Sequence, residues 1–297
     1  MDTVILGEIE QGLDVYLDRL AAQADAFFII NRVKIHTDFH GRYESGLMKM
    51  LAIGLGNQDG AFQLHNHGVH GLRDLMPKVA TYILTHSKLV AGIATIEDGY
   101  HRPVELAVLP HDEILSREPG LLERSRDFVP RLPVDDVDVL IVDEIGKEIS
   151  GAGMDTNVIG RFWIDGEPDP DTPRIKALVA LDLTEASHGN ACGIGLADFT
   201  TQRLVDKIDF QVTALNIRTS GFLRRGHIPL VLATEDDAID AALHHVFRRN
   251  PGARRDARVV RIRNTLALDH LQVSASLIDD VRASPGFISL AAEGTQP

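Results

Sequence analysis

The chain has 297 residues, of which 44% are hydrophobic and 25% charged, a composition typical of a globular protein long enough for two domains. It contains no apolar run of membrane-spanning length, and its acidic first residues lack the pattern of a secretory signal, so we expect neither a membrane span nor export. The net charge of −13 opposes binding to nucleic acid phosphates. Cys192 is the single cysteine, which excludes disulfides within the chain and cysteine-rich metal sites, and we expect a cytoplasmic protein.

Short apolar runs rich in β-branched residues alternate along the chain with amphipathic stretches. Because buried strands look like such runs and surface helices repeat apolar residues every three or four positions, this alternation predicts an α/β fold with mostly parallel or mixed sheets. The predicted strands are residues 27–30, 91–96, 137–142, 177–183, 229–233 and 259–262. The predicted helices are residues 13–24, 44–55, 72–85, 113–128, 196–208, 236–247 and 274–282.

The segment LPVDD at residues 132–136 has the proline and acid content of a connection, and the strand VDVLIV follows it. Exposed connections of this kind separate domains. We therefore predict two α/β lobes, residues 1–132 and 133–297, with a cleft between them.

Histidine, lysine and glycine are concentrated in residues 32–68. His36 follows a predicted strand, and the carboxyl ends of strands are where sites collect in α/β folds. Lys49 falls in the predicted helix 44–55 among apolar residues. Desolvation there lowers the pKa of a lysine and makes its amine available for covalent attachment. The alternative is that the long side chain brings the ammonium group to the surface.

His65 and His67 are two positions apart. On a strand or an extended loop their rings share one face and can join a metal site made of nitrogen and oxygen ligands. The alternative is a pair of hydrogen-bonded surface histidines.

The segment NRVKIHTDFHGRYESGLMKMLAIGLG and the later His65 resemble the core pattern of the lactate racemase family. That pattern is a strand, a histidine, a polar stretch with glycine, a lysine on a helix, an apolar glycine-rich run and a second histidine. The resemblance implies an isomerase, a racemase or epimerase of 2-hydroxy acids, that uses a nickel-pincer nucleotide (nickel pyridinium-3,5-bisthiocarboxylic acid mononucleotide). It implies His36 as the catalytic base, Lys49 as the residue joined to the cofactor through a thioamide, and His65 as the nickel ligand.

The resemblance continues more weakly through GIATIEDG and VDVLIVDEIGKEISGAGMDTNVIGR, but the tyrosine and glutamine of lactate racemase at a strand-end loop have no counterpart. The family also has an N-terminal region with a DGTHRP-like signature that supplies a second catalytic histidine, and this sequence begins after it. Residues 98–104, DGYHRPV, imitate the signature but follow Lys49, so we interpret His101 as an exposed loop residue. The resemblance therefore implies little or no activity for the chain alone, and either a homo-oligomer or a partner that supplies the N-terminal half.

The second lobe has two glycine-rich segments after predicted strands, where close backbone approach to a ligand is possible. Ordinary glycine-rich turns are the alternative. The candidate cofactor-binding residues in these segments are Asp155, Asn157, Arg161, His188 and Asn190.

Two other functions are compatible with the sequence. One is a non-catalytic α/β binding or assembly module. The other is a metal-dependent lyase or hydrolase that uses His36, His65 and His67 with Asp38. The arginine-rich residues 248–263 include almost no aromatic side chains for base stacking, so we interpret them as solvated surface and expect no nucleic acid partner.

Overall fold

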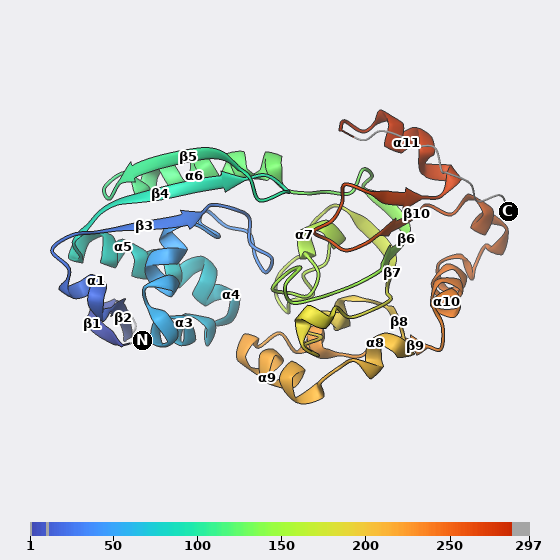
Figure 1. Ribbon diagram of the computed structural model, residues 1–297, viewed down its shortest axis with the longest axis horizontal. Helices are drawn as coiled ribbons and strands as arrows, with labels where there is room; N and C mark the ends of the chain where they lie inside the picture. The colour runs from blue at the N-terminus through green and yellow to red at the C-terminus, as the bar shows by residue number, and fades with distance from the viewer. Residues whose placement is uncertain (1, 10–11, 287–297) are drawn as a thin grey trace. The chain divides into compact units, whose positions relative to one another are not determined.

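The computed structural model describes residues 2–9 and 12–286, and the chain divides into two compact units, Met1–Val129 and Pro130–Pro297. Both units combine helices with parallel or mixed sheets (Figure 1), which confirms the predicted α/β fold class. Within the described residues, no helix is both long and apolar enough to cross a membrane.

Unit 1 contains a hairpin and a three-stranded mixed sheet. Its strands are β1 (Thr3–Ile9), β2 (Leu13–Asp18), β3 (Phe27–Arg32), β4 (Leu89–Glu97) and β5 (Pro103–Pro110). Its helices are α1 (Arg19–Gln23), α2 (Leu47–Lys49), α3 (Asn57–His65), α4 (Gly68–His70), α5 (Met76–His86) and α6 (Ile114–Ser125), with π-helical turns at Met50–Gly54 and Gly71–Leu75 and a 3-10 turn at Arg126–Phe128. The hairpin is β1 with β2, and in the sheet β3 runs parallel to β4, which is antiparallel to β5.

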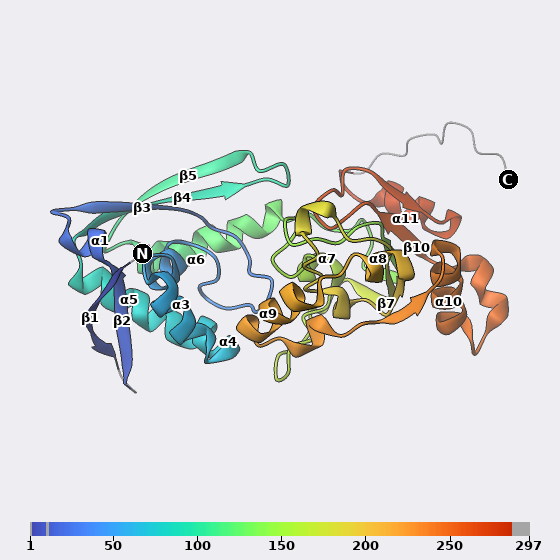
Figure 2. The same ribbon diagram turned by 60° about the horizontal axis from the view of Figure 1, so that its bottom comes forward.

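The core of unit 1 lies between this sheet and the helices on one of its faces (Figures 1 and 2). Leu47, Met48 and Leu51 are fully buried there, which fixes the backbone on both sides of Lys49. Burying large apolar side chains of this kind contributes about 1.5–3 kcal/mol each. The helix that bears Lys49 is therefore held rigidly against the sheet.

Unit 2 is built on a six-stranded sheet in the order β11-β10-β6-β7-β8-β9, in which β11 alone pairs antiparallel. The strands are β6 (Asp136–Val142), β7 (Arg174–Ala180), β8 (Phe199–Thr201), β9 (Leu230–Leu232), β10 (Val259–Ile262) and β11 (Leu271–Val273). The helices are α7 (Thr156–Ile159), α8 (Gln202–Asp206), α9 (Phe210–Ser220), α10 (Glu235–Phe247) and α11 (Ile278–Ala283). Separate apolar clusters cover the two faces of β6, which explains why its residues 139–142 are all apolar.

Two of the predicted elements were wrong in part. Residues 13–18 form strand β2 and not the start of a helix, because the segment pairs with β1 and buries alternate side chains. Residues 199–201, inside the helix predicted at 196–208, form β8 because they pair with β7 and β9. In both cases pairing with a distant strand overrides an apolar spacing that also fits a helix.

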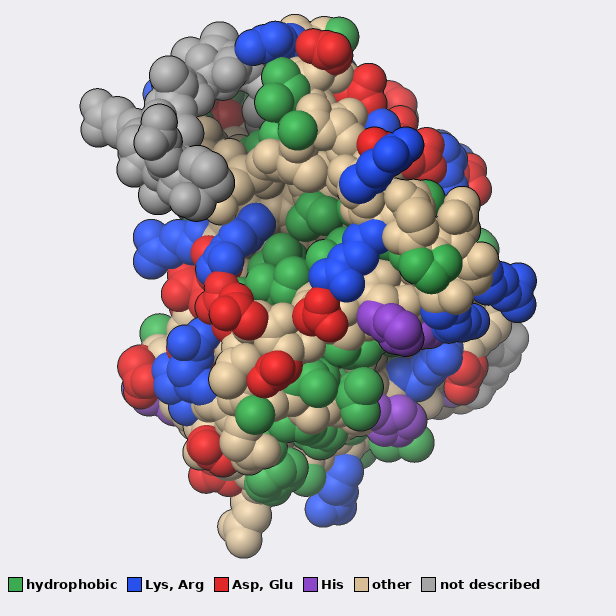
Figure 3. Space-filling view, turned by 90° about the vertical axis from the view of Figure 1, so that its right-hand side faces the viewer, with side chains coloured by type: hydrophobic (Ala, Val, Ile, Leu, Met, Phe, Trp, Pro, Cys, Tyr) green, Lys and Arg blue, Asp and Glu red, His purple; other side chains and the backbone are tan. Residues whose placement is uncertain are grey.

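Five arginines of the arginine-rich segment of unit 2 pair with carboxylates. The ion pairs are Arg254 with Asp240, Arg255 with Asp256, Arg258 with Asp280, Arg261 with Asp143 and Glu235, and Arg263 with Glu144. On the face shown in Figure 3, acidic and basic side chains are interspersed. A continuous basic surface, which nucleic acid binding needs, is not seen on that face.

Candidate functional site

Lys34 and Ser45 close the loop that contains His36. They form an antiparallel bridge in which Lys34 N donates to Ser45 O at 2.9 Å and Ser45 N donates to Lys34 O at 3.1 Å. The loop begins just after β3 ends at Arg32. His36 therefore lies where the sequence predicted it, at the carboxyl end of a strand, and its side chain is buried.

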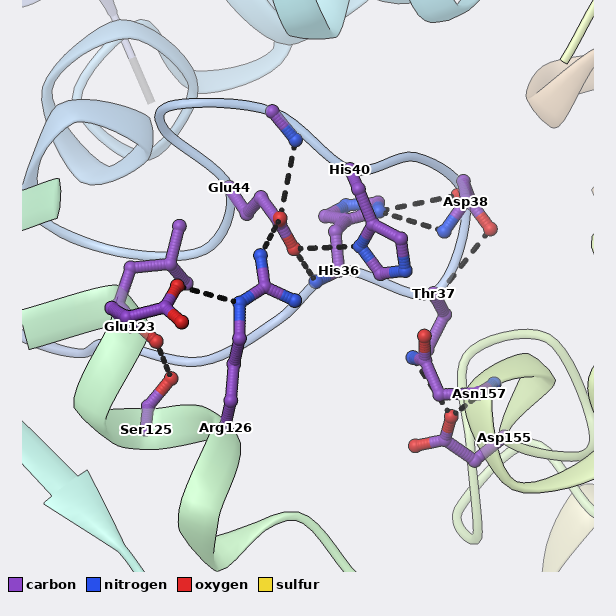
Figure 4. Close-up of polar contacts among 12 residues, drawn as sticks. His36, Thr37, Asp38, His40, Glu44, Glu123, Ser125, Arg126, Asp155 and Asn157 are labelled. Carbon is purple, nitrogen blue, oxygen red and sulfur yellow. Dashed lines mark hydrogen bonds and ion pairs between the residues drawn. The ribbon is translucent and has the colours of Figure 1, made fainter. Parts of the chain in front are cut away.

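Glu44 anchors this loop from the inside (Figure 4). Its fully buried carboxylate accepts from His36 N at 2.6 Å, Gly41 N at 3.2 Å and the guanidinium of Arg126 at 3.0 Å, and it lies 3.3 Å from Nδ1 of His40. A buried carboxylate is tolerated when charged and N–H donors surround it in this way. The contact with His36 N fixes the backbone of that residue.

Glu118 of α6 performs a similar task for the helix that bears Lys49. The helix starts at Leu47 without a side-chain cap of its own, and a carboxylate oxygen of Glu118 accepts from Met48 N at 3.0 Å. Burial raises the pKa of Glu118 to about 7. Gly46 permits this approach, since a Cβ there would lie 2.4 Å from Glu118 Oε1.

Lys49 and His36 form the centre of the site. The side-chain nitrogen of Lys49 lies 2.7 Å from Nε2 of His36, and the ring of Phe39 packs on the imidazole with centroids 4.6 Å apart. Burial lowers the pKa of Lys49 to about 8. Burial and, second, the positive charge of Lys49 lower the pKa of His36 to about 3. Lys49 is thus directed inward to His36, and the alternative of an ammonium group brought to the surface is wrong.

The backbone of Asp38 determines which nitrogen of His36 carries the proton. Asp38 N donates to Nδ1 of His36 at 3.1 Å, so this nitrogen must offer a lone pair. The neutral ring then has its proton on Nε2 and donates it to Lys49, which accepts only as an uncharged amine. At a pKa of about 8 Lys49 is mostly ammonium at pH 7, and about a tenth of it is the uncharged amine that can accept from Nε2. The pair therefore presents Lys49 as a nucleophile.

His65 is the last residue of α3 and lies partly buried near this pair. Burial and then the charge of Lys49 lower its pKa, and the charge of His65 in turn acts on His36. His67 is exposed beyond the end of α3, so the prediction that both histidines share one face of a strand or extended loop was wrong. A helix end turns residues two apart in different directions. No cluster of three or more His, Cys, Asp or Glu side chains suited to a metal occurs among residues 2–9 and 12–286.

His101, interpreted as an exposed loop residue, is exposed in the turn between β4 and β5. Its Nδ1 lies 2.9 Å from the guanidinium of Arg32, which also donates to Glu97 at 2.7 Å. In the same segment Arg102 pairs with Asp98 at 2.7 Å, so its charged side chains have structural partners.

The candidate residues of unit 2 make contacts within that unit. Asp155 caps α7 by accepting from Asn157 N at 2.9 Å. The buried guanidinium of Arg161 pairs with Asp198 at 2.8 Å and donates to two backbone carbonyls. Asn190 accepts from a backbone N–H two residues on, and His188 is exposed with a left-handed backbone. Asp155, Arg161 and Asn190 thus have structural contacts, and the role of all these candidates in cofactor binding stays a prediction.

Gly153 and Gly193 allow two loops of unit 2 to pack on each other. Gly153 has φ +79° and a Cβ there would lie 2.0 Å from Cys192 O, while Gly193 has φ +101° and its Cβ would lie 1.8 Å from Ala152 O. The backbone that these two glycines allow to approach closely therefore belongs to the same unit.

Sequence reasoning missed Glu44 and Glu118. The apolar stripe of α6 includes Ile114, Leu121 and Leu122, and Glu118 falls on the same helical face. An acid within an apolar stripe signals a carboxylate that has backbone or charged partners. Glu44 gave no comparable signal, because Arg126, the cation that pairs with its carboxylate, is distant in sequence.

No family model matches this chain, and no curated protein matches it. The fold is that of a two-unit mixed α/β protein with a lysine–histidine pair beside a strand end. Among solved structures, the chain is similar to the lactate racemase apoprotein from Thermoanaerobacterium thermosaccharolyticum, with a TM-score of 0.50 and 12% sequence identity over 89% of this chain and 67% of that one. At this identity the likeness is one of fold, and it supports at most a distant relationship.

Proposed function

We propose that this chain is a racemase or epimerase of small 2-hydroxy acids that holds a nickel-pincer nucleotide through Lys49. The observation that supports this most directly is the contact between Lys49 and His36, because it joins an amine of lowered pKa to an imidazole at a strand end. The likeness of fold to a lactate racemase apoprotein points in the same direction.

The residues of the site fit such a group. Attachment to the cofactor through a thioamide requires an uncharged amine, and the lowered pKa of Lys49 makes that form more abundant at pH 7 than in an ordinary lysine. His65 offers one nitrogen donor, and a nickel ion that already has sulfur ligands from its nucleotide does not need a cluster of protein ligands. The lyase or hydrolase alternative needs such a cluster, and the described part of the chain contains none.

When bound, the nickel-pincer nucleotide supplies a hydride acceptor for the α-carbon of the substrate. His36 then holds the proton that leaves the substrate hydroxyl. In the unloaded chain the charge of Lys49 opposes this role, since it helps to lower the pKa of His36 to about 3. Attachment of Lys49 through a thioamide would remove that charge and raise the pKa of His36. Glu44 and Glu118 keep both residues in position through the backbone.

The test is intact-mass measurement of protein produced together with the enzymes that make the cofactor. We expect a mass adduct on the wild type and on Lys88→Gln, an exposed lysine of unit 1, and none on Lys49→Ala. His65→Ala should keep the adduct and contain less nickel by elemental analysis. An adduct that persists in Lys49→Ala, or wild-type protein without any adduct, would refute the proposal.

A further inference from the structure

A cavity of about 290 Å³ lies in unit 1 beside Lys49. It is lined by Asn31, Arg32, Lys34, Ser45, Lys49, Met50, Ile53 and Gly54. Its volume is close to the lower end of the roughly 300–1,000 Å³ range of small-molecule sites. The cavity is thus large enough for part of a ligand whose reacting atom is at Lys49.

The two walls of this cavity differ in chemistry. The wall formed by β3 and the bridge after it contributes Arg32, Lys34 and the polar Ser45. The opposite wall is the π-helical turn with Met50 and Ile53, which is apolar. A ligand that fits both walls has an anionic end and an apolar or flat body.

The charge of the lining has one sign. Arg32, Lys34 and Lys49 are basic, and none of the lining residues is acidic. Glu97 pairs with Arg32 at 2.7 Å but does not line the cavity. Asp38, which also lies outside the lining, is the carboxylate whose charge raises the pKa of Lys49. The charge of Lys34 lowers the pKa of both Lys49 and His36. Positive charge gathered in a partly enclosed space attracts oxyanions.

We propose that this cavity binds the oxyanion end, a phosphate monoester or a carboxylate, of the molecule that occupies the site at Lys49. The inference extends the proposed function, because both a nucleotide cofactor and a 2-hydroxy acid have such an end. Arg32 and Lys34 are the residues that recognise it, and they set the orientation of the ligand relative to the amine of Lys49.

Pyridoxal 5′-phosphate and pyridoxal are the probes, since they share an aldehyde and differ by a phosphate. The amine of Lys49 adds to the aldehyde, water leaves, and added borohydride delivers a hydride to the imine carbon and fixes the label. Peptide mapping then gives the rate of labelling at Lys49 with each reagent. Because pyridoxal largely closes to a hemiacetal through its free 5′-hydroxyl, the rate ratio is divided by the ratio for Nα-acetyllysine under the same conditions. We expect a rate ratio of about ten in favour of the phosphorylated reagent, the size expected from one charge-assisted contact.

Lys34→Gln should bring this ratio close to one. The variant also changes the charge around Lys49, but that effect is common to both reagents, so the ratio isolates recognition of the phosphate. Lys88→Gln is the matched control and should keep the wild-type ratio.

Competition distinguishes the two sources of the oxyanion. Protection of Lys49 by inorganic phosphate alone assigns the cavity to a phosphate group, protection by lactate alone assigns it to a substrate carboxylate, and protection by both shows a general oxyanion site. A wild-type ratio near one, a high ratio that neither anion reduces, or no labelling of Lys49 by either reagent overturns the inference. No cofactor is used, so failure of the nickel-pincer proposal leaves this result unchanged, and a ratio near one leaves attachment at Lys49 untouched.

Discussion

Lys49 and His36 are linked by a 2.7 Å contact between the lysine amine and Nε2 of the imidazole, and the charge of Lys49 lowers the pKa of His36. Burial is the first cause of the low pKa of His36, and the charge of Lys49 is the second. A change to the lysine must therefore appear in the titration of the histidine.

Lys49→Met removes the charge and keeps most of the side-chain volume. We expect the pKa of His36 to rise above about 3 and to stay below 6.5, because burial remains. Imidazole nitrogen shifts followed by NMR against pH measure this, with the His36 signal identified by its loss in His36→Gln. Lys88→Met should have no effect, and an unchanged or lower pKa in Lys49→Met would contradict the coupling.

Glu44→Ala should destabilise unit 1 by about 3 kcal/mol, because it leaves Arg126 and several N–H donors of the His36 loop without their buried acceptor. Glu123→Ala is the matched control. Glu123 also pairs with Arg126, at 3.2 Å, but its side chain is 80% exposed, so its loss should cost less than about 1 kcal/mol. Urea unfolding curves measure both, and equal losses would show that Glu44 does not anchor the loop.

Glu118→Gln should change how stability depends on pH. The pKa of Glu118 is about 7 in the folded chain against 4.5 for the free side chain, so the folded state binds the proton more tightly. The wild type therefore loses stability from this group as pH rises from 4.5 to 7, by about 3 kcal/mol in total, and Glu118→Gln should not show that loss. Unfolding free energies at several pH values test the difference.

Glu118→Met separates titration from capping. It also lacks the titrating group, but it cannot accept from Met48 N, so it should be less stable than Glu118→Gln at every pH. A wild-type pH slope that survives in both variants would assign the slope to other groups.

Gly153→Ala should destabilise unit 2 by about 3 kcal/mol, since the residue has φ +79° and its added Cβ would meet backbone at 2.0 Å. Gly151→Ala, two residues earlier, is the control. Its Cβ meets no atom within 4 Å, so it should be nearly neutral. Thermal unfolding of the two variants compares them directly, and similar melting temperatures would contradict the close loop packing.

The sequence predicted the elements that are buried in one regular way, a strand on both faces or a helix on one. Strand β6, with its apolar residues 139–142, and helix α10, with its amphipathic pattern, lie close to their predicted bounds, because a strand buried on both faces and a helix buried on one have distinct periodicities. The pattern failed at residues 13–18, where the same apolar spacing fits a helix and a strand and pairing with β1 decided the outcome.

The sequence by itself placed His36 after a strand and Lys49 on an apolar helix, and its resemblance to a known family suggested that the two act together. Only the tertiary structure decided their charge states. A pKa depends on how much water surrounds a group and on which charges and N–H donors lie within a few ångströms, and for His36 those are Lys49, Asp38 and the loop held by Glu44. These distances depend on how the loop and the helix within residues 36–49 fold back and pack on each other, which local sequence patterns do not encode.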